Sequence, residues 1–443
     1  GKKIGDGTSE TNTFTFYSVG AATVLENLVA YKGTDDGFEW FGGTVSGKNL
    51  VAYGNYDDSF DWQDGWRGQT NSNWFAYQVG TGNLAGAATA IVSGGPGAIF
   101  WMWISAFFGM ATIYAEAVLG QLFKKDVNGT IVGGPSYYIE KLFNGNKLAK
   151  AMAVFFSISC ILALGFMGNA VQSNSIGEAL ENSFKIPTIV TGLVISVLGG
   201  FVFFGGVKRI ASVTEKVVPI MAGLYILVCF VVILLNFKSV FYAFEAIFVN
   251  AFSTKAILGG FLGAGIKKAI RYGVARGLFS NEAGMGSTPH AHAIAKVKKP
   301  EDQGHIAIVT VFIDTFVVLT LTALVILTSR VDLTGLKGIK LAQMAFSGTL
   351  GSFGGAFISI SLFFFAFSTV IGWYFFGESN IKYLFGDKAI NIYRVLVMIC
   401  IVLGTAQKVE LVWELADLFN GLMVIPNLIA LIALNGFVKD TTL

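Results

Sequence analysis

The chain has 443 residues, of which 53% are hydrophobic and 13% carry a charged side chain. Soluble proteins have about 25% charged residues, so this composition excludes a disordered chain, a nucleic-acid-binding protein and a water-soluble enzyme of ordinary composition. The charge is divided unevenly, with a net charge of −5 on residues 1–78 and of +8 on residues 79–443. Because these two parts differ physically, we treat them as separate domains.

Residues 1–78 contain a repeat with a period of 22 residues. The sequence NLVAY at 27–31 recurs at 49–53, and the acidic pair 35–36 recurs at 57–58. Short β-prone runs that alternate with Asp- and Gly-rich turns predict the rungs of a β-solenoid, similar to repeats of secreted bacterial surface proteins. The Asp pairs either bind Ca²⁺ or cap turns, and we favour the turns.

From residue 95 onward, eight apolar runs have the length of about 20 residues that a membrane-spanning helix needs. They lie near 95–123, 151–176, 187–206, 210–236, 305–329, 352–377, 389–407 and 411–436. Backbone polar groups in lipid must be paired within the segment, so these runs are predicted to be helices. The predicted fold class is an all-α polytopic membrane protein.

Two further apolar segments, near 79–86 and 279–287, are interrupted by glycine and polar residues. Each glycine costs a helix interior roughly 1 kcal/mol, so both segments are predicted to be discontinuous helices. They start about 200 residues apart, and the four spans after each repeat at nearly the same offset. Five spans are an odd number, so the second copy (about 266–437) is inverted relative to the first (about 79–236). This five-plus-five inverted-repeat fold is typical of secondary transporters, which bind substrate and ion between the halves.

The first break offers a hydroxyl, bare backbone and an amide at Thr81, Gly82 and Asn83. The free N–H groups of a half-helix N-terminus suit a carboxylate, and unwound carbonyls suit a small cation. We therefore favour a binding site at Gly80, Gly82 and Asn83. Three nearby glycines are assigned to tight helix packing instead: Gly86, Gly94 and Gly109.

The second break carries Glu282, an acid at membrane depth. Such carboxylates are costly and are functional candidates, but Glu282 is equally a structural ion-pair partner of Arg271 or Arg276, or a cap of the helix break. His290 and His292 follow a proline and approach a lysine-rich loop, so we expect them at the membrane interface rather than in a proton relay.

Polar residues also interrupt the third span of each copy. In the first copy Asn169, Gln172 and Asn174 either hold a ligand or bond a neighbouring helix, and both alternatives stay open. In the second copy the hydroxyls of Ser368 and Thr369 suit Na⁺, because hard cations take oxygen ligands, although such hydroxyls also bond their own helix.

The second spans carry one acid each, Glu116 and Asp314. These acids either couple protons or pair with a helix end or a lysine, and we favour the pairing. No glycine loop followed by Lys-Ser/Thr supports ATP-driven transport, and no nucleophile has a base partner. We therefore expect no enzyme activity.

Several motifs are similar to those of one family, the alanine-or-glycine:cation symporters, also called sodium:alanine symporters. The most specific is GGPGAIFWMWISAFFG at 94–109, and others lie at 80–83, 133–135, 276–284, 367–369 and 372–373. The resemblance runs from about residue 79 to 443. It implies Na⁺-coupled uptake of alanine or glycine by alternating access, in a prokaryotic plasma membrane.

The resemblance also implies a set of binding residues. The substrate residues would be Thr81, Gly82, Asn83, Gln172, Phe279, Asn281, Gly284 and Trp373. Na⁺ would bind backbone near Gly80 and the hydroxyls of Ser368 and Thr369. A tryptophan and a phenylalanine closing over the ligand would favour a small side chain. The expected partners are a small neutral amino acid, Na⁺ as coupling ion and the lipid bilayer, with no other cofactor and no nucleic acid.

The sequence departs from the family before residue 79. The family would have another span there, followed by the first half of the broken helix, where this sequence has the 22-residue repeat. We interpret residues 1–78 as foreign to the family and the chain as a chimaera joined at 78/79. Two alternatives to the Na⁺ symporter are a defective or fused transporter lacking that half-helix and a proton-coupled carrier of small amino acids.

Overall fold

The structure is a computed structural model of the chain. It describes seven strands between residues 14 and 63, and residues 81–442 apart from 128–129, 253–264, 330–334, 337 and 408. Gly80 and the Asp pairs at 35–36 and 57–58 lie outside the described residues, so the predictions for them stay predictions. The chain divides into two units, which are described separately.

The first unit consists of short parallel strands: β1 (Phe14–Val19), β2 (Val24–Glu26), β3 (Val29–Tyr31), β4 (Phe38–Gly43), β5 (Ser46–Lys48), β6 (Val51–Tyr53) and β7 (Phe60–Gln63). They form three ladders, in the orders β1-β4-β7, β2-β5 and β3-β6. Val29 pairs with Val51 and Phe38 pairs with Phe60, one sequence repeat further on. Parallel strands stacked at the repeat period confirm the β-solenoid-like segment.

The second unit is helical. Its first copy contains η1 (Gly82–Gly86), α1 (Ala87–Gly94), α2 (Ala98–Leu122), α4 (Lys147–Cys160), η3 (Ile161–Gly168), α5 (Asn169–Phe184), α6 (Thr188–Phe203) and α7 (Gly206–Leu235). Its second copy contains α9 (Ile266–Asn281), α10 (Pro289–Ile294), α11 (Pro300–Val311), η4 (Phe312–Leu319), α12 (Thr320–Thr328), α14 (Ser352–Phe385), α15 (Ile390–Thr405) and α16 (Val409–Ala433). Matching elements start about 200 residues apart, as the sequence predicts.

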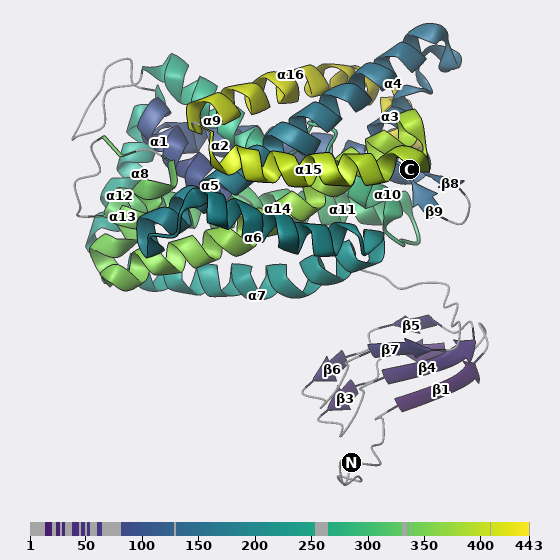
Figure 1. The fold of residues 1–443 in the computed structure, drawn as a ribbon, viewed down its shortest axis with the longest axis horizontal. Helices are drawn as coiled ribbons and strands as arrows, with labels where there is room; N and C mark the ends of the chain where they lie inside the picture. Colours follow the sequence, from purple (N-terminus) through teal and green to yellow (C-terminus); the bar gives the residue numbers. More distant parts are fainter. Residues whose placement is uncertain are drawn as a thin grey trace. The chain divides into compact units, whose positions relative to one another are not determined.

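Shorter elements connect the spans. They are the hairpin β8 (Lys125–Val127) and β9 (Thr130–Val132), α3 (Pro135–Ile139), η2 (Leu142–Gly145), α8 (Phe237–Phe252), α13 (Gly338–Leu350), η5 (Asp387–Ala389) and α17 (Asn435–Thr442). In Figure 1 the hairpin and α10 lie at one end of the helical unit, and α8 and α12 lie at the other. The helices between these ends are the membrane spans.

Among the described residues, seven helical segments are long and apolar enough to cross a membrane. The helix Thr188–Phe203 is equally apolar but shorter. All eight apolar runs predicted from the sequence are therefore helical, which confirms a polytopic membrane protein. Many large apolar side chains on α6, α7 and α15 are exposed, as expected for surfaces that face lipid.

The two copies are interlocked rather than separate. Helix α2 of the first copy packs against α9 and α11 of the second, and α5 packs against α14 and α15. The first break is also next to the second copy, because η1 contacts both α9 and η4. The centre of the unit is thus an interface between repeats, where a transporter of this type binds its substrate.

Backbone conformation accounts for the second break. Helix α9 ends at Asn281, and the next residues include Glu282, Gly284 and Gly286, with φ of 58°, 88° and 80°. Three left-handed residues within five positions cannot continue a right-handed helix, and two of them are the glycines that adopt this conformation at no steric cost. The predicted discontinuity of the second helix is confirmed. Of the first segment, the structure describes the part from Thr81 onward, which is helical through η1 into α1, so the discontinuity predicted there stays a prediction.

Three π-helical stretches lie in the same unit: η1, η3 and η4. Such stretches are rare and are found mostly at functional sites. The first follows the Thr81 break, the second precedes Asn169, and the third contains Asp314. They therefore mark the same helices that the polar residues of the sequence single out.

Candidate functional site

The π-helical stretch η1 touches the last turn of α9, just before the second break, at Gly82. A Cβ atom at this position would lie 2.6 Å from Cα of Ser280, a backbone atom that no side-chain rotation can move. Glycine is therefore required here by close approach of two helices. The buried Thr81 beside it donates its N–H to Oε1 of Gln172, at 3.4 Å. Two predicted substrate residues, Thr81 and Gln172, thus contact each other, and a third, Gly82, contacts the end of α9.

Asn83 contacts an acid of the second copy. Its Nδ2 donates to Oδ1 of Asp314 at 2.6 Å, while Ser280 and Thr315 donate their hydroxyl protons to Oδ2 at 2.9 and 3.0 Å. The expectation that Asp314 pairs with a helix end or a lysine is therefore wrong. Its partners are an amide and two hydroxyls, on η1, α9 and η4.

Glu116, the matching acid of the first copy, supports the second break. Its oxygens accept the N–H groups of Gly284 and Gly286 at 3.0 and 2.8 Å and Nδ2 of Asn427 at 2.6 Å. This confirms the expected pairing of Glu116 with a helix end. Asn427 also donates to the carbonyl of Gly284 at 3.0 Å and accepts the hydroxyl of Tyr138.

The two acids form a reciprocal arrangement. Glu116 belongs to the first copy and holds the break of the second, whereas Asp314 belongs to the second copy and contacts the break of the first. The sequence pairs the two acids by position but does not single out Asn427, whose span also carries Glu414, Asp417 and Asn420.

Aromatic side chains cover the second break. The rings of Phe279 and Trp373 meet edge to face with centroids 5.4 Å apart, and Trp413 lies 4.6 Å from Phe279. Both Phe279 and Trp373 are buried. The absence of a side chain at Gly168 of η3 makes room for Trp373, since a Cβ there would lie 2.5 Å from the indole.

Glu282 has a different partner from the one considered in the sequence. Its Oε1 accepts the indole N–H of Trp373 at 2.6 Å. Arg276 instead forms a two-pronged ion pair with Asp417 and lies over the ring of Trp413. The ion-pair interpretation of Glu282 with Arg276 is therefore wrong, while its left-handed backbone at the end of α9 fits a cap of the break.

The other predicted binding residues are engaged as follows. Asn281 donates to the hydroxyl of Thr315 and accepts the N–H of Ala283, so it closes the end of α9. Gly284 has both backbone polar groups bonded, to Glu116 and Asn427. Ser368 and Thr369 both donate to the carbonyl of Phe365 one turn earlier, which leaves the oxygen lone pairs as acceptors.

The three polar residues in the third span of the first copy have different partners, so both a binding role and helix-to-helix bonding are represented among them. Gln172 reaches the first break, Asn169 bonds the carbonyl of Gly165 in its own helix, and Asn174 bonds the carbonyls of Gly404 and Gln407.

Both histidines lie on α10 and are buried, each 2% exposed. Helix α10 lies at one end of the helical unit in Figure 1, and the placement of the histidines at the membrane interface stays a prediction. His290 lies between Ser287 and Asn380, and His292 contacts Gln303.

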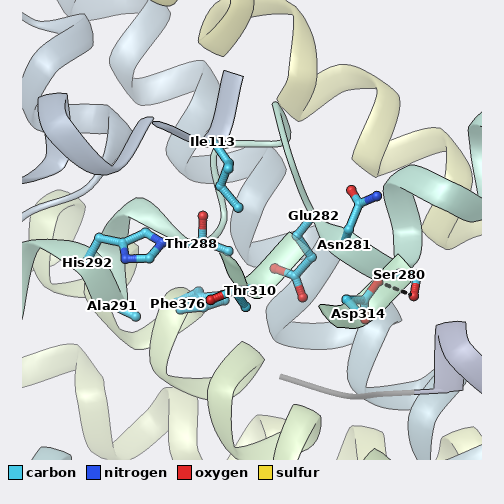
Figure 2. Close-up of a pocket in the computed structure, with 10 residues that line it drawn as sticks. All are labelled: Ile113, Ser280, Asn281, Glu282, Thr288, Ala291, His292, Thr310, Asp314 and Phe376. Carbon is cyan, nitrogen blue, oxygen red and sulfur yellow. Dashed lines mark hydrogen bonds between the residues drawn. The ribbon is translucent and has the colours of Figure 1, made fainter. Parts of the chain in front are cut away.

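A small cavity of about 40 Å³ extends from the second break. Figure 2 shows Ser280, Asp314 and Glu282 at one side of its lining and His292 at the other. A volume of this size holds an ion or one or two water molecules rather than an amino acid. Among the described residues, the cavity beside the second break is therefore too small for an amino acid.

Comparison with known proteins agrees with this geometry. A profile described as the sodium:alanine symporter family matches residues 72–442, and a profile of pectate-lyase-like β-helix domains matches residues 1–95. The chain belongs to the sodium:alanine symporter family. Members are transporters and not enzymes, and with its helical spans this symporter is a multi-pass plasma-membrane protein.

Named relatives of the symporter differ in their substrates. The sodium/alanine symporter AgcS of Methanococcus maripaludis is 43% identical over 372 residues, covering 83% of this chain and 81% of its own. The probable sodium/glutamine symporter GlnT of Bacillus subtilis is 46% identical over 374 residues, covering 83% and 76%. Because the chain is similarly identical to both relatives, their names do not decide which amino acid it transports.

Among solved structures, the symporter resembles MhsT, crystallised with L-phenylalanine. The TM-score is 0.56 at 13% identity, over 79% of this chain and 85% of that one. At this identity the likeness concerns the fold alone, and it agrees with the predicted inverted-repeat transporter architecture.

Proposed function

We propose that the symporter takes up alanine or glycine together with Na⁺ by alternating access. The observation that carries the proposal is the contact of η1 with the last turn of α9 at Gly82 and Ser280, beside the buried pair Phe279 and Trp373. Polar backbone ends of two half-helices and an apolar cover then surround one small space between the repeats.

The ends of the half-helices suit a zwitterion. At the first break the N-terminal end carries partial positive charge, which favours the substrate carboxylate. Among the described residues, the N–H of Thr81 has one acceptor, Oε1 of Gln172 at a long 3.4 Å, so a carboxylate can replace the amide oxygen. The C-terminal end of α9 at Asn281 carries partial negative charge, which favours the ammonium group.

The cover limits the substrate side chain. Trp373 is 1% exposed and Phe279 is 4% exposed, and the indole is fixed by Glu282 on one side and by the close approach of Gly168 on the other. Because neither ring has room to withdraw without losing these contacts, we favour a methyl group or hydrogen over a longer side chain. Glutamine is the comparison substrate, since one relative is named for it.

For Na⁺ we propose the hydroxyl oxygens of Ser368 and Thr369 with backbone near Gly80. Each hydroxyl donates its proton within its own helix, so both lone pairs remain acceptors and suit a hard cation. Na⁺ acts here as transported coupling ion. No further cofactor is needed in this proposal.

The test of the proposal is uptake of labelled alanine, glycine and glutamine by cells expressing the chain, with Na⁺ or equimolar K⁺ outside. We expect Na⁺-dependent uptake of alanine or glycine, and its loss in Asn83→Ala, which leaves Asp314 without its amide partner. Expression is checked by quantifying the protein in membranes. Uptake driven equally in K⁺ by a proton gradient would replace the Na⁺ proposal with the proton-coupled carrier.

The same assay bears on residues 1–78, which we propose to be a β-solenoid-like segment foreign to the symporter domain at 79–443. Na⁺-dependent uptake would mean that the transporter works with this segment joined to it. Membrane-inserted protein without uptake of any of the three amino acids would instead support the defective-transporter alternative.

A second prediction concerns the indole of Trp373. In Trp373→Phe, Glu282 keeps its burial but loses the donor to Oε1, and an unsatisfied buried acceptor costs about 1–3 kcal/mol. We expect the half-saturation concentration for alanine to rise about tenfold. Trp103→Phe is the matched control, because it removes an indole bond to Thr320 away from the breaks. Equal kinetics for the two variants would contradict the role of Trp373.

A further inference from the structure

Arg394 is a charged residue on the span α15, and its side chain is 16% exposed. A guanidinium carries five N–H donors, which need acceptors at this depth. Nε donates to the hydroxyl of Tyr374 and Nη1 to Oδ1 of Asn391, both at 3.1 Å. Nη2 lies 3.6 Å from Oε2 of the buried Glu378, an ion pair that is longer than a hydrogen bond. Among the described residues, Arg394 therefore has more donors than acceptors.

Arg394 lies near the end of the helical unit that carries the hairpin of β8 and β9. Near the end of α14, the hydroxyl of Tyr383 donates to Glu140, which pairs with Lys125 of β8. The turn from α14 to α15 is thus at the hairpin end, and Arg394 lies one helical turn further into the span. From this depth a long cationic side chain reaches the headgroup region of the bilayer.

The chain segments that meet at Arg394 are basic. They are residues 378–394 and residues 204–210, which start with Phe204, the ring beneath the guanidinium. Together they hold five basic and two acidic residues. Of the acids, Glu378 is buried and Asp387 pairs with Lys382 at 3.5 Å. This excess of positive charge at the end of the spans favours an anionic partner at the bilayer surface.

A groove of about 430 Å³ runs between α6 and α15 on their exposed side. Its lining is apolar apart from Ser196, whose hydroxyl donates to the carbonyl of Met398. Along α15 the lining extends from residue 395 to residue 403, about 12 Å at 1.5 Å per residue. This length is close to the roughly 15 Å of hydrocarbon in one leaflet. The groove therefore fits an acyl chain that lies along the helices.

Phe204 connects the groove to the arginine. Its ring belongs to the groove lining, and the guanidinium carbon of Arg394 lies 5.4 Å from the ring centroid. Val395, the next residue of α15, also belongs to the lining. An apolar groove with a guanidinium at its end matches a phospholipid, because arginine binds phosphate oxygens in pairs and the groove accepts the chain.

We propose that this groove binds an anionic phospholipid, with the phosphate on Arg394 and one acyl chain between α6 and α15. The basic segments favour an anionic headgroup over a zwitterionic one. The groove shares no residue with the proposed substrate and Na⁺ sites. Lipid binding is therefore a property of the chain beyond the proposed uptake of amino acids.

The bound lipid would be linked to the transport helix α14. Arg394 is joined to α14 through Tyr374 and Glu378, and Tyr374 stacks on Phe203 at the end of α6, with ring centroids 3.8 Å apart. A phosphate on Arg394 would thus hold α15 and the end of α6 against α14. The same helix carries Trp373, which covers the second break, directly before Tyr374.

The test is a titration of the purified full chain in detergent with dioleoyl phosphatidylglycerol or dioleoyl phosphatidylcholine. The acyl chains are identical, while the first headgroup is anionic and the second zwitterionic. Bound lipid is counted by native mass spectrometry, without Na⁺ or amino acid. We expect the wild type to bind phosphatidylglycerol about tenfold more tightly than phosphatidylcholine.

The first variant removes the headgroup contact. Arg394→Gln should weaken binding of phosphatidylglycerol about tenfold, because it removes the charge and the paired hydrogen bonds to phosphate. Arg271→Gln is the matched control, since it removes an exposed arginine that lies over the ring of Tyr272, outside the groove lining.

The second variant fills the groove. Val395→Trp places an indole at an exposed position of the lining and leaves Arg394 with its partners, so it serves if Arg394→Gln is not recovered folded. We expect about tenfold weaker binding of phosphatidylglycerol. Leu227→Trp is the control, because Leu227 is also exposed but lies on α7, outside the groove lining.

The outcomes decide the proposal independently of transport. Equal affinity for the two lipids, or unchanged affinity for phosphatidylglycerol in either folded variant, would overturn it. Soluble glycerol phosphate provides a further arm. If it displaces phosphatidylglycerol at equal concentration, Arg394 binds phosphate without an acyl chain, which would also overturn the lipid site. None of these results changes the expected uptake of alanine or glycine, so each proposal fails separately.

Discussion

Gly82→Ala is expected to abolish uptake while the protein still inserts in the membrane. The added methyl group would lie 2.6 Å from Cα and 2.8 Å from Cβ of Ser280, so η1 and α9 must separate. Overpacking of this kind costs about 1–3 kcal/mol, and a displacement of about 1 Å at a reacting or binding centre lowers rates about 100-fold. The measurement is the initial rate of labelled alanine uptake per amount of membrane-inserted protein.

Gly86→Ala is the control for this variant. Gly86 lies in the same π-helical stretch, but its added Cβ would meet nothing closer than the carbonyl of Thr81, at 3.8 Å. Alanine also favours a helix over glycine by about 1 kcal/mol, so we expect normal uptake and slightly higher stability. Wild-type kinetics in Gly82→Ala would show that η1 and α9 need not touch, and would remove the central observation of the proposed site.

Glu116→Ala is expected to have the largest effect on stability. It leaves three buried donors without an acceptor, the N–H groups of Gly284 and Gly286 and Nδ2 of Asn427. Each unsatisfied group costs about 1–3 kcal/mol, and the sum approaches the whole stability of many domains. We expect the apparent Tm of the detergent-solubilised protein to fall by about 10 °C or more, with loss of uptake.

Two further variants are compared with Glu116→Ala. Glu116→Gln keeps one carbonyl oxygen as acceptor, so its Tm should lie between those of the wild type and Glu116→Ala. Glu140→Ala removes a partly exposed acid that contacts Tyr383 and Lys125, and surface pairs of this type contribute about 0–1 kcal/mol. A Tm change for Glu116→Ala no larger than that for Glu140→Ala would show that the second break does not depend on the carboxylate.

The fold could be predicted because its signals are local and repeated. Runs of about 20 apolar residues indicate spans by their length alone, and clustered glycines indicate the break at 279–287. The 22-residue repeat likewise predicts parallel rungs, since stacked strands need the same residues at the same spacing. These patterns depend on neighbours in the chain and require no knowledge of packing.

The partners of buried polar groups could not be predicted in the same way. Asn427 is 311 residues from Glu116, and Arg276 is 141 residues from Asp417. Proximity in sequence favoured Arg276 for Glu282, six residues away, but at the end of a helix the two side chains point to different elements. Glu282 turns to Trp373 because a left-handed backbone reverses the chain directly after α9.

The reciprocal acids also set the order of events during synthesis. Glu116 leaves the ribosome 168 residues before Gly284, and Asn83 leaves it 231 residues before Asp314. At about 5–20 residues per second, each waits on the order of ten seconds or more for its partner. During that interval Glu116 and Asn83 lack the partners from the second half that they have in the folded chain. The nascent first half must therefore stay beside the insertion machinery, or in contact with water, until the second half arrives.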